Sequence, residues 1–173
     1  ALLMSCLQAK VQVLAEDVGD IGAWMGRLNR LMTANCPSNR FITLFFAVLD
    51  PGAGSMLYSN AGHNPPIVVR KNGEVELLTE GGMVLGLLPT ANYRAGQCRA
   101  RAGDMLVLYS DGITEAVDPS GEEFGEERLT RLVVENRDRR AAEIAQQVQR
   151  SLADWTAGKP ATDDITLVIA KRS

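Results

Sequence analysis

The hydrophobic pattern changes period twice along the chain, and this change constrains the fold more than any other feature of the sequence. Before residue 34 the apolar residues follow helical spacing. One face of a first predicted helix carries Leu3, Leu7, Val11, Leu14 and Val18. Asp20 is placed to cap a second helix, whose apolar stripe consists of Ile21, Trp24, Met25, Leu28, Leu31 and Met32. We expect this helix to end at Cys36-Pro37, because proline and the residue before it disfavour helix.

From residue 40 the pattern becomes extended. The continuous apolar run 41–49 predicts a strand that is covered on both faces. Turn residues separate further predicted strands, at 56–59, 67–70, 75–78, 93–99, 105–109 and 165–170. Residues 50–54 read as a hairpin loop, and Asn72-Gly73 is the strongest hairpin signal in the chain. Helical spacing returns over 126–135 and 141–155. We therefore predict one α+β domain, residues 1–173, with mostly antiparallel sheet.

Composition excludes several classes of protein. Charged residues make up 23% of the chain and hydrophobic residues 46%, as in ordinary globular proteins. The net charge of −3 argues against a nucleic-acid partner, because a domain that grips phosphates is normally basic. No apolar run approaches the ~18 residues that a membrane span needs.

Three cysteines, Cys6, Cys36 and Cys98, have no regular spacing. An odd, irregular set indicates a reducing compartment rather than a disulfide framework, so we expect a cytoplasmic protein. With a single histidine, a structural zinc site is not expected. The first residues read as the middle of a helix, without the basic flank of a signal peptide, and we expect sequence upstream of them.

Two acidic motifs adjoin predicted strands. Asp111 follows the strand 105–109 and precedes Gly112, while Asp163-Asp164 comes just before the strand 165–170. Taken separately, the first reads as a plain turn and the second as a solvated loop. If the two strands are antiparallel neighbours, however, Asp111 and Asp163 lie at one sheet edge. Their charges repel unless a cation lies between them, and oxygen ligands favour Mg²⁺ or Mn²⁺.

A third motif, Asn60-Ala61-Gly62-His63-Asn64-Pro65, contains the only histidine. We interpret His63 as a structural loop residue whose ring bonds to backbone. Motifs for other phosphate chemistry are missing from the sequence: a nucleophile elbow, a Walker loop, a dinucleotide-binding glycine run, and a cysteine followed six residues later by arginine.

These motifs together resemble a known family. Ser110-Asp111-Gly112-Ile113-Thr114-Glu115-Ala116, Asp163-Asp164-Ile165-Thr166 and the Asn60 motif resemble the sporulation-protein-E type of PP2C-like serine/threonine phosphatases. The resemblance covers nearly the whole chain. It implies two stacked, mainly antiparallel sheets flanked by helices, in an α-β-β-α sandwich.

The resemblance also implies a site and partners. It makes Asp111, Asp163 and Asp164 ligands of a two-metal centre of Mn²⁺ or Mg²⁺, bordered by Gly112, His63 and Asn64. It implies phosphoserine or phosphothreonine hydrolysis on a bacterial signalling protein, usually an anti-sigma-factor antagonist. It further implies an upstream sensor or regulatory domain, and we expect the first two helices to serve in regulation or as a homodimer surface.

Two family motifs are absent from these 173 residues: a Gly-Asp strand motif and a Gly-Asp-Val-x-Gly loop. Their aspartates bridge the metals in the family. We expect the chain to begin just after the second motif and to have little activity alone. Two alternatives stay open: a catalytically silent binding module, and a hydrolase of small phosphate esters.

Overall fold

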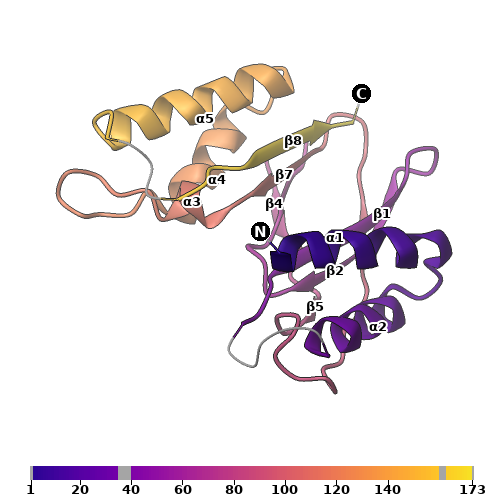
Figure 1. Cartoon of the computed structure of the whole chain (residues 1–173). Coiled ribbons are helices and arrows are strands. Elements are labelled where there is room, and N and C mark those ends of the chain that lie inside the picture. Colours follow the sequence, from indigo (N-terminus) through magenta and orange to yellow (C-terminus); the bar gives the residue numbers. More distant parts are fainter. Residues whose placement is uncertain (1, 35–39, 160–162, 173) are drawn as a thin grey trace. The chain divides into compact units, whose positions relative to one another are not determined.

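The fold divides into two compact units in a computed structural model that describes residues 2–34, 40–159 and 163–172. Unit 1 comprises Ala1–His63 and Leu78–Arg99, and unit 2 comprises Asn64–Leu77 and Ala100–Ser173. Each unit combines helices with its own sheet, and the strands are mainly antiparallel (Figure 1). The predicted α+β class is therefore confirmed.

Unit 1 places two helices beside a four-stranded sheet. The helices are α1 (Leu2–Leu14), a 3-10 turn (Ala15–Asp17) and α2 (Ile21–Thr33). The strands are β1 (Leu44–Asp50), β2 (Ser55–Ala61), β5 (Gly81–Gly82) and β6 (Gly96–Arg99). β1 and β2 form an antiparallel hairpin, β6 pairs antiparallel with β2, and β5 pairs parallel with it. The segment 81–82 was not predicted as a strand.

Most residues of the predicted helical stripes belong to the core of unit 1, but the prediction is wrong for Leu31, which is 42% exposed. Leu7 and Leu14 of α1 are buried against α2, and the Trp24 ring stacks on Phe46 of β1 with centroids 4.0 Å apart. Asp20 caps α2 as predicted, since its carboxylate accepts a hydrogen bond of 2.7 Å from the Ala23 N–H. One detail differs: α1 ends at Leu14, so Val18 packs against the core from beyond the helix. The predicted helix end at Cys36-Pro37 lies outside the described residues.

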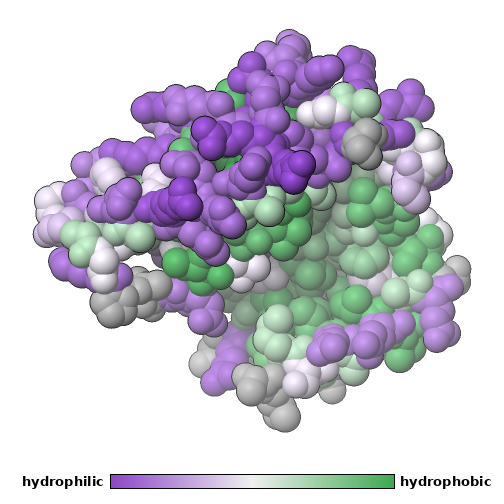
Figure 2. All heavy atoms as spheres, turned by 90° about the horizontal axis from the view of Figure 1, so that it is seen from above, coloured by the Kyte–Doolittle hydropathy of each residue, from purple (hydrophilic) through white to green (hydrophobic). Residues whose placement is uncertain are grey.

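The apolar run 41–49 is less covered than its composition predicts. Phe41 is 58% exposed and Leu49 is 66% exposed, so the prediction of a strand buried on both faces is wrong at both ends of the run. Within the described residues β1 pairs with β2 only, so it is an edge strand of its sheet. Figure 2 shows hydrophobic and hydrophilic residues gathered in separate regions of one face of the molecule.

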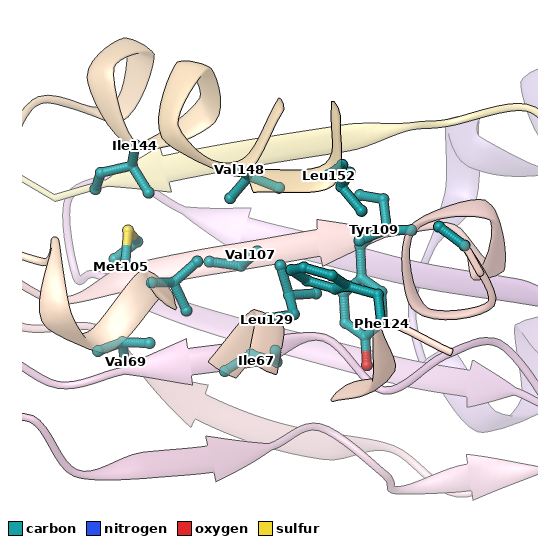
Figure 3. Close-up of a cluster of buried hydrophobic side chains, with 13 residues drawn as sticks. Ile67, Val69, Met105, Val107, Tyr109, Phe124, Leu129, Ile144, Val148 and Leu152 are labelled. Carbon is teal, nitrogen blue, oxygen red and sulfur yellow. The ribbon is translucent and has the colours of Figure 1, made fainter. Parts of the chain in front are cut away.

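Unit 2 contains a four-stranded antiparallel sheet in the order β4-β3-β7-β8. Its strands are β3 (Ile67–Val69), β4 (Val75–Leu77), β7 (Met105–Tyr109) and β8 (Leu167–Lys171), and its helices are α3 (Asp111–Thr114), α4 (Gly125–Glu135) and α5 (Ala141–Trp155). The inner face of the sheet packs under α4 and α5 through one apolar cluster (Figure 3). Val107, Leu129, Ile144 and Val148 of this cluster have no exposed surface.

The predicted hairpin at Asn72-Gly73 joins β3 to β4. Gly73 has φ of 92°, which glycine adopts without strain, and the Asn72 side chain accepts a 3.0 Å hydrogen bond from the Glu74 N–H. Strand ends differ by a few residues from the predictions: β6 begins at Gly96 and β8 at Leu167. Within the described residues, no helix has both the length and the apolar character to cross a bilayer.

Asp104 is a buried carboxylate that ties this hairpin to the turn before β7. It is 3% exposed and accepts hydrogen bonds from the Arg70 guanidinium and from the N–H groups of Lys71 and Arg101, at 2.9–3.0 Å. Burial by itself would raise the pKa of Asp104. The hydrogen bonds from Arg101, Lys71 and Arg70 outweigh burial and hold this pKa below its ordinary value of 3.8.

We predict that Asp104→Asn lowers the free energy of unfolding by about 2–4 kcal/mol at pH 7, because an amide N–H₂ then faces buried donors. A lowered folded-state pKa stabilises the protein above the ordinary pKa and loses that effect as pH falls through the folded value. The difference between wild type and variant should therefore shrink below about pH 4. Urea unfolding at pH 7 measures the loss of unfolding free energy, and urea unfolding at pH 3 measures how far the difference between wild type and variant has shrunk.

Asp138→Asn is the matched control, since Asp138 is exposed in the same unit. We expect it to change the unfolding free energy by less than ~0.5 kcal/mol. Equal effects of the two substitutions at pH 7 would contradict the role given to Asp104.

Candidate active site

The pairing of β7 with β8 positions the two acidic motifs. These strands are antiparallel, and their register ends with Tyr109 opposite Leu167. Ser110 extends the ladder beyond the strands: its N–H donates to the Thr166 carbonyl at 3.0 Å, and its hydroxyl donates to the Asp164 carbonyl at 2.9 Å. The Thr166 N–H in turn donates to the Ser110 hydroxyl at 2.9 Å. The prediction that these strands are antiparallel neighbours is confirmed, and Asp111 and Asp163 belong to the same end of the pair.

Both carboxylates are exposed and are held by the backbone next to them. Asp111 is the first residue of α3, and its Oδ1 accepts a 2.9 Å hydrogen bond from the Gly112 N–H. The Oδ1 of Asp163 accepts one of 2.7 Å from the Asp164 N–H. No lysine, arginine or histidine forms an ion pair with Asp111, Asp163 or Asp164 in the part of the chain that the structure describes. Their negative charges therefore have no protein counter-ion there.

Position 112 needs glycine because a side chain would not fit there, and not because the backbone adopts a conformation that favours glycine. The Asp111-Gly112 pair reads as a turn in the sequence, yet Gly112 lies in the short helix α3 and its φ is not left-handed. A Cβ at this position would lie 2.5 Å from the Asp164 carbonyl oxygen. Glycine therefore lets the start of α3 approach the backbone of the Asp163-Asp164 motif.

The donor set suits a hard divalent cation only in part. Carboxylate oxygens are the ligands that Mg²⁺ and Mn²⁺ prefer. Among the described residues, however, no group of three or more His, Cys, Asp or Glu side chains is arranged to hold a metal ion. Asp111, Asp163 and Asp164 are thus oxygen donors of a suitable kind, but they are not grouped as a three-ligand metal site.

The third motif forms a closed loop whose organising residue is Asn60. This side chain is 5% exposed; its oxygen accepts from the His63 N–H at 2.8 Å, and its nitrogen donates to the His63 carbonyl at 2.9 Å. The ring Nδ1 of His63 lies 3.3 Å from the Thr43 hydroxyl, so the ring contacts a side chain of the same unit. His63 belongs to unit 1, while Asn64 and Gly112 belong to unit 2.

Two positioning residues were not recognised from the sequence. Ser110 and Asn60 both stand within quoted motifs, but small polar residues at strand ends are common, and only the fold shows which backbone groups they bind. Local hydrogen bonds also hold the acidic segment after α3. Asp118 accepts from the Ser120 hydroxyl at 2.7 Å and from the Glu122 N–H at 2.9 Å, and these hydrogen bonds lower its pKa.

Comparison with solved structures defines the class of fold. The chain superposes on the SiaA-PP2C domain of Pseudomonas aeruginosa with a TM-score of 0.86 at 20% identity, covering 100% of this chain and 70% of that one. For the phosphatase domain of the cell fate determinant SpoIIE from Bacillus subtilis (Mn presoaked), the TM-score is 0.67 at 18% identity, covering 94% of this chain and 73% of that one. The chain therefore has the fold of PP2C phosphatase domains.

Sequence comparison names the family within that class. The chain belongs to the Stage II sporulation protein E (SpoIIE) family, whose model matches residues 1–173. It is 30% identical over 174 residues to phosphoserine phosphatase RsbU of Bacillus subtilis, covering 99% of this chain and 51% of RsbU. It is 32% identical over 133 residues to protein IcfG of Synechocystis, covering 77% of this chain and 21% of IcfG. The chain thus spans about half or less of these relatives.

We predict that Gly112→Ala lowers the free energy of unfolding by about 1–3 kcal/mol, because the new methyl group overlaps the Asp164 carbonyl and the backbone must shift. Chemical denaturation measures the loss. Gly19→Ala is the control: a Cβ there meets nothing within 4 Å, and φ is not left-handed. We expect this control to be neutral or slightly stabilising. A Gly112→Ala protein as stable as the control would contradict the close packing of α3 on the Asp163-Asp164 backbone.

Proposed function

We propose that this chain is the greater part of a metal-dependent protein phosphatase domain that hydrolyses phosphoserine or phosphothreonine on a bacterial signalling protein. The observation that carries the proposal is the convergence of Asp111 and the Asp163-Asp164 motif at one end of the β7–β8 pair, in a chain of the SpoIIE family. A relative of similar sequence, RsbU, is named a phosphoserine phosphatase.

In this proposal, Asp111, Asp163 and Asp164 supply oxygen ligands to Mn²⁺ or Mg²⁺. Bound as a pair, such cations would provide an activated water and neutralise charge on the phosphoryl oxygens. Ser110 holds the Asp164 backbone through its hydroxyl, and Gly112 leaves room for that backbone. These two residues therefore position the ligands without binding the cation. A role for Gly112, His63 and Asn64 at the border of the site is part of the proposal.

The metal shell would be completed by aspartates that these 173 residues do not contain. The sequence lacks the Gly-Asp and Gly-Asp-Val-x-Gly motifs, and the described residues contain no three-ligand cluster. We therefore expect weak or no activity from this chain by itself. The assay belongs on a protein that joins the chain to a segment carrying both motifs.

Two other functions make different predictions. A silent binding module of the same fold would stay inactive even when both motifs are supplied. A hydrolase of small phosphate esters would act on p-nitrophenyl phosphate at least as well as on phosphoproteins. The acidic motifs at one end of the β7–β8 pair have no basic ion-pair partner among the described residues, and this favours a metal enzyme over the silent module because a bound cation would offset their charge.

The substrate and partners follow by resemblance. We propose a phosphorylated anti-sigma-factor antagonist as substrate, an upstream sensor or regulatory domain, and a cytoplasmic location. A homodimer through α1 has less support, because its stripe residues Leu7 and Leu14 are buried in the core of unit 1. Met4 and Val13 are exposed on α1, but nine positions separate them, which places them on opposite sides of the helix.

We predict that Asp111→Asn, in the motif-completed protein, lowers Mn²⁺-dependent dephosphorylation of a phosphoserine protein by at least ~100-fold, since even outer-shell partners of a metal are worth about 10–100-fold. The fold should persist, because Asp111 is exposed and asparagine preserves its shape. Phosphate release and circular dichroism measure the two effects.

The control is Asp138→Asn, which removes an exposed carboxylate from the same unit and should leave the rate unchanged. Retention of most activity by Asp111→Asn would show that Asp111 is not a ligand. Inactivity of the unsubstituted, motif-completed protein would instead favour the silent module.

A further inference from the structure

A polar cleft in unit 1 is separate from the residues assigned to the proposed function. It lies between α2 and the segment 91–93 and has a volume of about 360 Å³. α2 and the loop that follows β5 are neighbours in the same unit (Figure 1). The α2 side of the cleft is formed by Gly22, Ala23, Gly26, Arg27 and Arg30. Asn92 and Tyr93 contribute from the other side.

Helical spacing gathers the two arginines on one side of α2. Counted from Ala23, the other residues of this face follow at three, four and seven positions, and they are Gly26, Arg27 and Arg30. These spacings place all four on one face of the helix. Gly26 adds no side chain to this face, and the Arg30 guanidinium lies 3.6 Å from the place of its missing Cβ. Both arginines are exposed. The face therefore presents two cationic groups above a floor of small residues.

The cleft is preformed because hydrogen bonds hold α2 against the loop that follows β5. The Asn29 side chain donates to the Leu88 carbonyl at 2.8 Å and accepts from the Gly86 N–H at 2.9 Å. At Gly22, a Cβ would lie 2.5 Å from the Tyr93 carbonyl oxygen, so helix and loop are in close contact there. A ligand would meet walls that are already in place, which lowers the cost of binding.

The described side chains supply no ion-pair partner for the arginines of the cleft. Neither Arg27 nor Arg30 forms an ion pair within the described residues. Asp20, at the start of α2, accepts a hydrogen bond from the Ala23 N–H and pairs with neither arginine. Burial raises the pKa of Tyr93 to about 12, so its hydroxyl adds no negative charge near neutral pH. An anion would thus supply the missing counter-charge.

We propose that this cleft binds a phosphate group through Arg27, Arg30 and Asn92. Guanidinium groups present several donors in a planar fork that matches the oxygens of a phosphate. The Asn92 amide can add a further donor from the facing wall. The cleft volume leaves room for the phosphate together with part of the molecule that carries it. Free inorganic phosphate and a phosphorylated residue of a protein share this chemistry.

The first test titrates inorganic phosphate into the chain, in EDTA and at constant ionic strength, while NMR follows the backbone amides. We expect saturable shifts at residues 22–30 and 91–93. Arg27→Gln and Arg30→Gln should each weaken phosphate binding at least ~10-fold, because charge-assisted hydrogen bonds dominate such sites. Arg40→Gln, which removes an exposed charge of unit 1 outside the cleft lining, should leave the affinity unchanged.

A second pair of variants tests the site without removing an arginine. Ala23 is exposed and lies four positions before Arg27, so Ala23→Glu places an internal carboxylate beside the guanidinium. This variant should fold at least as stably as wild type and lose phosphate binding. Ala23→Gln, of the same size but neutral, should keep phosphate binding within ~3-fold of wild type. Equal binding by the Glu and Gln variants would overturn the proposal, as would the absence of saturable shifts in wild type.

A phosphoserine peptide identifies the source of the phosphate. Tighter binding of the peptide than of inorganic phosphate, lost in Ala23→Glu, assigns the cleft to a phosphorylated protein segment. Equal or weaker binding, also lost in Ala23→Glu, assigns it to free phosphate. Peptide shifts that survive Ala23→Glu, or that spare residues 22–30, would exclude the phosphorylated protein segment and leave free phosphate as the occupant.

Discussion

The antiparallel pairing of β7 with β8 is the contact on which the candidate active site depends. The two strands are far apart in the chain, and their register decides which residues meet at the end of the ladder. With Tyr109 opposite Leu167, the next residues on each strand carry the acidic motifs to a common edge. A shift of register by one residue would turn every side chain of β8 to the other face of the sheet and separate the motifs.

Short polar contacts hold that register at its open end. Ser110 donates its hydroxyl to the Asp164 carbonyl and accepts from the Thr166 N–H, so a single side chain replaces the next two ladder bonds. Gly112 allows the start of α3 to approach the same carbonyl. Behind these contacts, the apolar cluster under α4 and α5 fixes the strands themselves. Packing therefore supplies the stability of the site, while Ser110 and Gly112 supply its local geometry.

The candidate active site and the cleft on α2 carry charges of opposite sign. The carboxylates at the end of β7 and β8 are exposed and have no basic partner among the described residues, whereas Asp104 at the other end of β7 is buried and fully partnered. The cleft on α2 shows the opposite case, with two arginines for which the described residues supply no acidic partner. At the acidic motifs and in the cleft on α2, the described residues supply no opposite charge. A bound ion of opposite sign would lower the electrostatic energy at either place.

The sequence alone determined the type and order of most elements, because helical and alternating periodicities report directly which face of each element is buried. It also determined the hairpin at Asn72-Gly73, the cap at Asp20 and the acidic motifs beside two strands, since each depends on local backbone chemistry. Tertiary structure decided the rest. The exposure of Leu49 depends on whether another element covers it, and the packing reason for Gly112 follows from the approach of residue 164. The cleft on α2 depends on a loop some 65 residues away along the chain. Such contacts between distant segments leave no periodic signal in the sequence, so only the folded chain shows them.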